Sequence, residues 1–198
     1  MIRILPLQYL YFSNRMHKTG KFNYLELDQL DAKRLVIPYK GNRLSMVIIL
    51  PNKKDGLLKL EEQLRSVDIF EVANQKTPMS GKEVSLSLPK FKIDSTHHLK
   101  DSLQKIGIKH MFDPKDADFS GISGIKELYV SNMIQKAFIE VNEEGSEAYA
   151  ATMADMVDGL PTAVKPLQFT CDHPFLFMIK DHLTGMILFS GKITNPIF

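Results

Sequence analysis

The sequence predicts an α+β fold built mostly from antiparallel β-sheets, with a few helices. About eight segments show the apolar pattern of strands and about three show helical spacing, without regular alternation of the two kinds. Alternation would be needed for parallel βαβ units, so its absence favours antiparallel pairing. A hydrophobic content of 44% and a charged content of 24% are ordinary for a globular chain with a buried core.

The first strands are expected in the N-terminal quarter. Residues 21–27 alternate, and the segments 34–40 and 44–51 are rich in β-branched and aliphatic side chains. The Gly-Asn-Arg segment 41–43 between them predicts a hairpin, because Gly and Asn adopt the backbone angles of tight turns. Pro51 ends the third strand, since proline has no N–H to donate to a neighbour.

Three helices are expected. Residues 56–65 place Leu57, Leu60 and Leu64 at helical spacing, and residues 67–74 form a second short helix. The third is predicted over 96–108, with Thr96 as its N-cap. The buried stripe of this third helix is expected to comprise Leu99, Leu103 and Ile106.

The remaining segments are read as strands and loops. Residues 85–93 alternate, with Pro89 at a bend or an edge. Residues 112–124 are rich in Asp, Ser and Gly and predict a loop, which 127–141 follows as a long strand. Three more strands are expected within 164–172, 174–181 and 186–193, the last two joined by a turn at 182–185.

Bulk properties exclude several classes of function. The formal charge of +2 and the lack of a Lys/Arg cluster predict no nucleic-acid or membrane-surface partner. No apolar run approaches the roughly 20 residues of a spanning helix. Cys171 is the single cysteine, which excludes an internal disulfide and a cysteine-based metal site and predicts a small buried side chain. The apolar start of the chain is interrupted by Pro6 and Gln8, so no clear signal peptide is expected.

The search for catalytic and metal-binding patterns predicts no enzyme, cofactor or metal site. The GxSxG, HExxH, GxGxxG and Walker A patterns are absent. His97 and His98 are adjacent, so they would not share a helix face, and they are read as a solvated helix start. Glu143 and Glu144 would point to opposite faces of a strand and could not flank one bond together.

Residues 143–159, EEGSEAYAATMADMVDG, are the least settled part of the pattern. Two carboxylates and a glycine precede a run of small residues that would favour a helix, yet the segment lies between strand-like sequences. The flanking sequences KAFIEV and DHPFLFMIKDHLTGMILFSGKI, together with this segment, resemble the serpin family of serine protease inhibitors. The resemblance extends over residues 16–198, whereas residues 1–15 match poorly and form an atypical N-terminal segment.

The resemblance implies the C-terminal part of a single serpin domain, with the N-terminal half of the fold missing. It implies a reactive loop at about residues 143–165 that a target serine protease cleaves, after which the loop inserts into the large sheet as a new strand. The strand at about 130–142 would border the insertion gap, while its partner strand is absent. Family resemblance also implies a secreted, extracellular protein. The exposed sheet edges of such a part predict self-association.

The hinge of the loop is expected to be able to insert. By the strand period of two, Ser146, Ala148, Ala150 and Thr152 share one face, and all are small enough to enter a closing sheet. Tyr149 departs from the small residue usual in the family but falls on the outer face. The full hinge implied by the resemblance comprises Glu143, Glu144, Gly145, Ser146, Glu147, Ala148, Tyr149, Ala150, Ala151 and Thr152.

The resemblance also suggests a scissile bond and an ion pair. Counting from Gly145 places the bond between Gly159 and Leu160, with Leu160-Pro161 or a bond near Met156 as alternatives. No Lys or Arg lies between positions 147 and 164, so the expected target is elastase-like or chymotrypsin-like rather than trypsin-like. Lys90 is expected to pair with Glu143.

Other interpretations stay open at this point. Gln135 replaces the His usual in the family, so pH control of sheet opening there is in doubt. The chain could instead be a non-inhibitory serpin, or a truncated, inactive one that acts as an interaction protein. An unrecognised hydrolase is the third reading, although the motif search gives it no support.

Overall fold

The computed structural model describes residues 10–11, 15–75, 81–142 and 165–196. The chain divides into two compact units, Met1–Lys92 with Glu140–Phe198 and Ile93–Ile139. Residues 143–164, which make up nearly all of the predicted reactive loop, lie outside the described residues.

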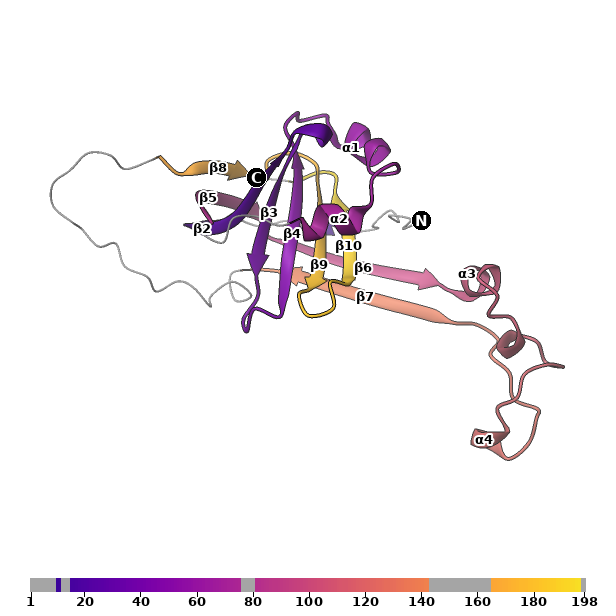
Figure 1. The fold of residues 1–198 in the computed structure, drawn as a ribbon. Helices are drawn as coiled ribbons and strands as arrows, with labels where there is room; N and C mark the ends of the chain where they lie inside the picture. The colour runs from indigo at the N-terminus through magenta and orange to yellow at the C-terminus, as the bar shows by residue number, and fades with distance from the viewer. Residues whose placement is uncertain (1–9, 12–14, 76–80, 143–164, 197–198) are drawn as a thin grey trace. The chain divides into compact units, whose positions relative to one another are not determined.

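A seven-stranded sheet forms the larger unit (Figure 1). Its strand order is β10-β9-β4-β3-β2-β5-β8, and every neighbouring pair is antiparallel except β5 and β8. The long β2 connects the two parts of the sheet, because residues 23–27 pair with β3 and residues 15–22 pair with β5. The strands are β2 (Arg15–Leu27), β3 (Ala32–Pro38), β4 (Leu44–Pro51), β5 (Lys82–Pro89), β8 (Leu167–Thr170), β9 (Phe175–Asp181) and β10 (Ile187–Ile193).

The predicted hairpin is confirmed between β3 and β4. Its turn is closed by hydrogen bonds from the backbone N–H of Tyr39 to the Leu44 carbonyl and from that of Asn42 to the Tyr39 carbonyl. Gly41 and Asn42 have φ angles of 85° and 56°, the left-handed region in which Gly and Asn are favoured. The turn chemistry therefore accounts for the register of the two central strands.

Two short helices cover one face of this sheet, as the sequence predicted. They are α1 (Leu57–Gln63) and α2 (Ile69–Asn74), and a 3₁₀ turn, η1 (Asp28–Leu30), lies at the end of β2. The Asp68 carboxylate caps α2 by accepting a hydrogen bond from the N–H of Phe70 at 2.8 Å. Leu57 and Leu60 are buried, whereas Leu64 is half-buried. Val47, Ile49, Leu176 and Met178 on the sheet form the opposite side of this core.

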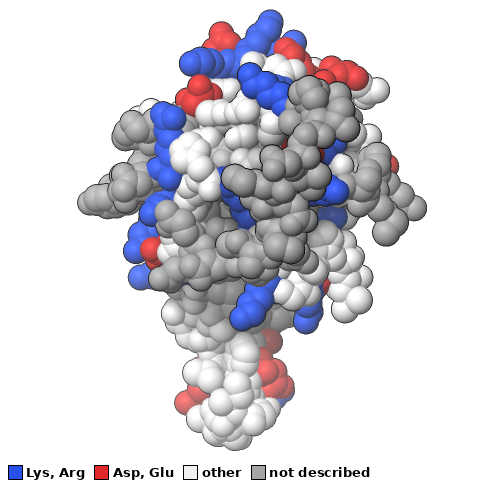
Figure 2. All heavy atoms as spheres, turned by 90° about the vertical axis from the view of Figure 1, so that its left-hand side faces the viewer, with Lys and Arg blue, Asp and Glu red and all other residues white. Residues whose placement is uncertain are grey.

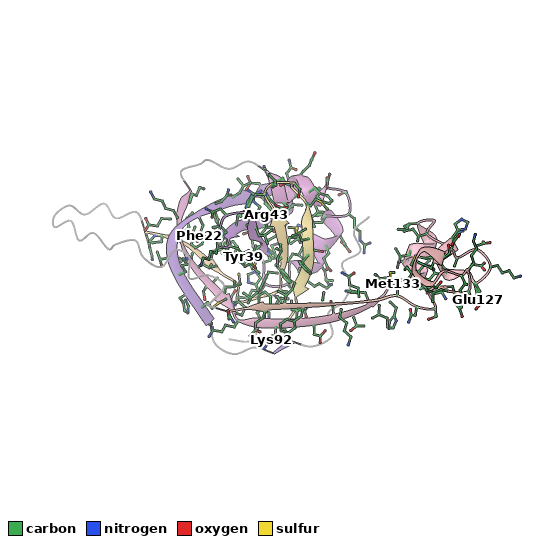
Figure 3. All side chains as sticks on the ribbon, turned by 90° about the horizontal axis from the view of Figure 1, so that it is seen from below. Phe22, Tyr39, Arg43, Lys92, Glu127 and Met133 are labelled. Atoms are coloured by element: carbon green, nitrogen blue, oxygen red, sulfur yellow. The ribbon has the colours of Figure 1, made fainter. Side chains whose placement is uncertain are left out.

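Aromatic side chains fill the opposite face of the sheet. Phe91 packs against Phe175 and Phe177, with ring centroids 6.4 and 5.4 Å apart. Phe22, labelled in Figure 3, is also buried, as is Tyr24 two residues further along β2. The curved β2–β5–β8 part of the sheet thus has its own apolar interior.

A second sheet has the strand order β1-β6-β7. Its members are β1 (Leu10–Tyr11), β6 (Phe91–His98) and β7 (Ile134–Val141). The predicted strand 85–93 is divided between the two sheets, since β5 ends at Pro89 and β6 begins two residues later. Pro89 therefore lies at a bend, as expected for a residue that cannot donate to a ladder.

The predicted helix over 96–108 is wrong. β6 runs to His98, and the helix α3 is confined to Lys100–Lys105. None of the α3 residues is buried, and Ile106 from the expected apolar stripe is 74% exposed. The N–H of Leu99 donates to the Met133 carbonyl at 2.8 Å, so long-range pairing replaces the first helical turn. His97 and His98 accordingly lie in a strand and not at a helix start.

The start of the predicted strand 127–141 is also wrong, because β7 begins at Ile134. Glu127 and Met133, labelled in Figure 3, precede it. The N–H of Val130 donates to the Met111 carbonyl, and the ammonium group of Lys100 donates to the Ser131 carbonyl. The predicted loop 112–124 contains a short helix, α4 (Ser120–Ser123), and follows a 3₁₀ turn, η2 (His110–Phe112).

Candidate functional site

The candidate site is the pair of strands to which the loop 143–164 is attached. On the N-terminal side is β7, whose side chains alternate between exposed and half-buried from Lys136 to Val141. Among the described residues β7 is the last strand of its sheet, so one of its edges has no neighbouring strand. Such an edge presents backbone N–H and C=O groups that a further strand could bind.

A cross-strand ion pair lies close to this attachment. The ammonium group of Lys92 on β6 is 3.2 Å from the carboxylate of Glu140 on β7. Both side chains are about half exposed, so the pair contributes at most about 1 kcal/mol. Lys90 lies between β5 and β6, whereas Glu143, its expected partner, lies outside the described residues. The Lys90–Glu143 pair therefore stays a prediction.

On the C-terminal side the loop joins β8, which packs firmly into the larger unit. β8 runs parallel to β5, with Leu86 aligned to Phe169. Phe169 is fully buried and meets the ring of Tyr24 edge-to-face, with centroids 6.3 Å apart. Beyond β8, the N–H of Cys171 donates to the Ser87 carbonyl at 2.9 Å. Cys171 is buried as predicted, and burial raises the pKa of its thiol well above the ordinary value.

A partly buried histidine, His173, follows β8 and was missed by the sequence reasoning. The Nδ1 of His173 is 2.7 Å from the Asp172 carboxylate, and its Nε2 is 2.7 Å from the carbonyl of Pro51. Both partners are acceptors, so the two hydrogen bonds form together only when both ring nitrogens carry a proton. The hydrogen bond from His173 lowers the pKa of Asp172, and the Lys54 ammonium 3.5 Å away acts in the same direction. This cluster connects the start of β9 to the end of β4.

Two buried cations beneath α2 were also missed. The guanidinium of Arg34 donates to the carbonyls of Val72 and Gln75 at 2.7 and 2.8 Å. The ammonium group of Lys180 donates to the carbonyl of Ala73 at 3.3 Å. Burial lowers the pKa of both cations, and for Lys180 the charge of Arg34 adds to the effect. They satisfy the carbonyls at the C-terminus of α2, where positive charge is favoured.

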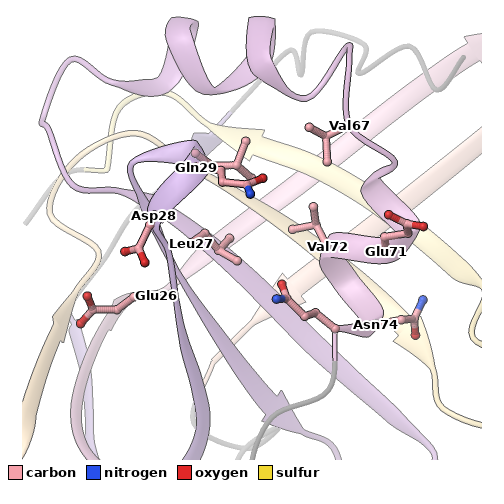
Figure 4. A pocket seen from close by; sticks show the side chains of 10 residues that line it. Glu26, Leu27, Asp28, Gln29, Val67, Glu71, Val72 and Asn74 are labelled. Atoms are coloured by element: carbon pink, nitrogen blue, oxygen red, sulfur yellow. The ribbon is translucent and has the colours of Figure 1, made fainter.

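An open cleft of about 680 Å³ lies beside η1 and α2 (Figure 4). Its floor is apolar and includes Leu27 and Val72, while Glu26, Asp28 and Glu71 contribute carboxylates. The described lining contains neither a Ser, Cys or Lys nucleophile nor a histidine base.

The described parts of the chain show no metal centre or membrane span. No three His, Cys, Asp or Glu side chains among the described residues come together in a way that would hold a metal ion. Within the same ranges, no helix is long and apolar enough to cross a bilayer. All the hinge residues of the predicted loop, and Gly159 and Leu160 at the predicted scissile bond, lie outside the described residues.

Comparison with known proteins identifies the family to which the chain belongs. The sequence profile described as Serpin (serine protease inhibitor) matches residues 13–196. The chain belongs to the serpin family. This confirms the family and the α+β fold that the sequence predicted.

Curated relatives and solved structures agree with this assignment. The serpin chain is 42% identical to Serpin B3 of Homo sapiens over 181 residues, covering 91% of this chain and 46% of the relative. It is 38% identical to the human leukocyte elastase inhibitor over 188 residues, covering 91% and 48%. The structure of Serpin48 from the insect Tenebrio molitor matches with a TM-score of 0.66 at 43% identity, covering 91% of this chain and 45% of that one. The chain thus spans about half the length of the curated relatives it matches.

Proposed function

We propose that this serpin inhibits an elastase-like or chymotrypsin-like serine protease, which cleaves the loop 143–164 between Gly159 and Leu160. The supporting observation is the free edge of β7 among the described residues, because the loop follows this strand directly. A loop that folds back on β7 would pair with it as an antiparallel strand. The relative named leukocyte elastase inhibitor supports a protease of this class as the partner.

The hinge sequence gives this proposal a matched pair of variants. If residues 146–152 insert as a strand, Ala150 faces the sheet interior and Ala151 faces outward. Ala150→Arg would then place a large charge into a closing sheet, which overpacking and desolvation both oppose. Ala151→Arg carries the same change of size and charge on the outer face and serves as the control.

Incubation with neutrophil elastase or chymotrypsin, followed by denaturing electrophoresis, tests the proposal. The unmodified chain and Ala151→Arg are expected to form a complex that survives boiling in detergent. Ala150→Arg is expected to be cleaved with at least tenfold less complex, since insertion and not recognition is blocked. Mass spectrometry of the released peptide locates the scissile bond. Equal complex formation by both variants would contradict the assignment of the inner face.

The length of the chain supports a second candidate, a non-inhibitory or truncated serpin that acts as an interaction protein. The chain spans about half the length of its relatives, so the second border of an insertion slot is not among the described strands. β10 is a terminal strand of the seven-stranded sheet, and its Leu188 and Phe189 are 45% and 40% exposed. Cleavage without a stable complex, together with dimers or larger species in sedimentation, would favour this candidate.

Secretion belongs to the same proposal and rests on the family resemblance. Because a target protease would meet the inhibitor outside the cell, the chain is expected in the medium of cells that express its complete transcript. Retention of all the protein inside those cells would contradict an extracellular role while leaving the inhibitory proposal intact.

A further inference from the structure

Lysines from three neighbouring segments lie where the loop joins β8. In the β2–β5 register, Lys21 is opposite Glu83 and Phe22 is opposite Lys82. In the parallel β5–β8 register, Val84 is aligned with Leu167. Extending this register by two residues toward the N-terminus of each segment aligns Lys82 with Lys165, the first described residue after the loop. We call Lys21, Lys82 and Lys165 the loop-base lysines.

The loop-base lysines are exposed, and Lys21 lies opposite the carboxylate residue Glu83 in the β2–β5 register. Lys21 and Lys165 form no ion pair within the described part of the chain, and the ammonium group of Lys82 lies 5.1 Å from the ring centroid of Tyr24. Figure 2 shows Lys and Arg side chains spread over the side of the molecule on which β8 begins. In segments 15–22, 82–89 and 165–170, the charged residues are Arg15, Lys18, Lys21, Lys82 and Lys165 against the single carboxylate Glu83.

The predicted scissile bond lies close enough to Lys165 for a bound protease to reach the loop-base lysines. Lys165 follows Gly159 by six residues. An extended chain spans at most about 3.6 Å per residue, so the two positions are within about 22 Å of each other. A globular domain of about 200 residues is about 40 Å across. A protease seated on the scissile bond is therefore large enough to reach the point where the loop joins β8.

We propose that the loop-base lysines form a docking surface for the target protease. This surface selects a protease that carries acidic residues next to the part of its cleft that binds substrate residues after the scissile bond. This inference rests on the proposed function and adds a determinant of specificity that the loop sequence lacks. Complementary charge at the rim of an interface mainly raises the association rate and makes it depend on salt. The loop residues select the class of protease, and the lysines select among proteases of that class.

The test compares charge-reversal variants in loop cleavage. Lys21→Glu/Lys165→Glu reverses two loop-base lysines and leaves Lys82 on the Tyr24 ring, so that packing is retained. Lys40→Glu/Lys59→Glu is the control, because it makes the same change of net charge at two exposed lysines, in the β3–β4 turn and on α1. Melting temperatures of both variants confirm that they fold like the unmodified chain.

The measurement is the second-order rate constant for cleavage within 143–164, using a panel of elastase-like and chymotrypsin-like proteases that differ in surface charge. With an acidic protease at about 30 mM salt, the loop-base variant is expected to react about tenfold more slowly, falling to about twofold at 0.5 M salt. With a basic protease the same variant is expected to react faster. The control should stay within about twofold throughout.

The outcomes separate the two proposals. If the loop is cleaved but the loop-base variant and the control behave alike, the docking surface is wrong and the inhibitory proposal stands. If no protease in the panel cleaves within 143–164, the proposed function fails and the docking surface fails with it. A reversed ranking of acidic and basic proteases between the unmodified chain and the variant would support both.

Discussion

Phe169→Ala should loosen the C-terminal attachment of the proposed reactive loop, because this side chain packs β8 against the core. Phe169 is fully buried, with an exposed fraction of 0%. Its ring meets that of Tyr24 edge-to-face at an interplanar angle of 89°. Truncation of a buried Phe to Ala costs about 3–5 kcal/mol through lost burial and the cavity left behind. In a chain of this size, that corresponds to a melting temperature lower by about 10 °C.

The assay is thermal and urea denaturation of the unmodified chain, Phe169→Ala and a matched control. Leu167→Ala is the control, since Leu167 lies on the same strand but is 38% exposed, and a loss below about 1 kcal/mol is expected. A double-mutant cycle with Tyr24→Leu isolates the ring pair, for which a coupling of about 0.5–1.5 kcal/mol is expected. If Phe169→Ala cost no more than Leu167→Ala, β8 would not be anchored by its aromatic side chain.

Two other predictions follow from local contacts. Hydrogen bonding from His173 and the charge of Lys54 lower the pKa of Asp172 in the folded state. The ionised carboxylate therefore stabilises the fold at pH values above its unfolded-state pKa of about 3.9. This stabilisation is lost as the pH falls through the folded-state pKa. The melting temperatures of the unmodified chain and Asp172→Asn should therefore converge on acidification from pH 6 to pH 3, and a constant difference would contradict the assigned cause. Gly56→Ala should cost about 1–3 kcal/mol in urea unfolding, because its Cβ would lie 2.8 Å from that of Pro51, whereas Gly121→Ala, with no atom within 4 Å of the added carbon, should be neutral.

The strands were predictable because the sequence signals that specify them act over only a few neighbouring residues. Period-two alternation, the Gly-Asn turn before Arg43 and the two strand-ending prolines each act within a few residues, and β3, β4, β9 and β10 formed where the sequence predicted. The prediction of a helix over 96–108 was wrong because this segment depends on contacts that are distant in sequence. Thr96, His97 and His98 extend the alternation of β6, and the bond from Leu99 to Met133 joins residues that are distant in sequence. Apolar spacing alone did not distinguish this strand end and short helix from one long helix.

The buried polar groups were unpredictable for a related reason. Arg34 and Lys180 lie beside the charged residues Lys33 and Asp181 in otherwise apolar strands. Their partners are carbonyls of α2, 38 and 107 residues away in the sequence. His173 likewise depends on the carbonyl of Pro51, 122 residues earlier. A sequence pattern could indicate only that a charge interrupts an apolar run, and that such a charge needs a partner if it is buried.

The two strands that flank the proposed reactive loop differ in a way that bears on how the loop could insert. β8 is joined to the core by a buried ring, a parallel ladder to β5 and the bond from Cys171 to Ser87, so the C-terminal end of the loop is held. β7 offers half-exposed side chains, an ion pair of at most about 1 kcal/mol and a free edge within the described strands. After the proposed cleavage between Gly159 and Leu160, only the part of the loop that follows β7 would still be joined to that strand and could pair with its edge. Because the hinge residues 143–152 follow β7 and not β8, strand addition would begin at the attachment with the open edge.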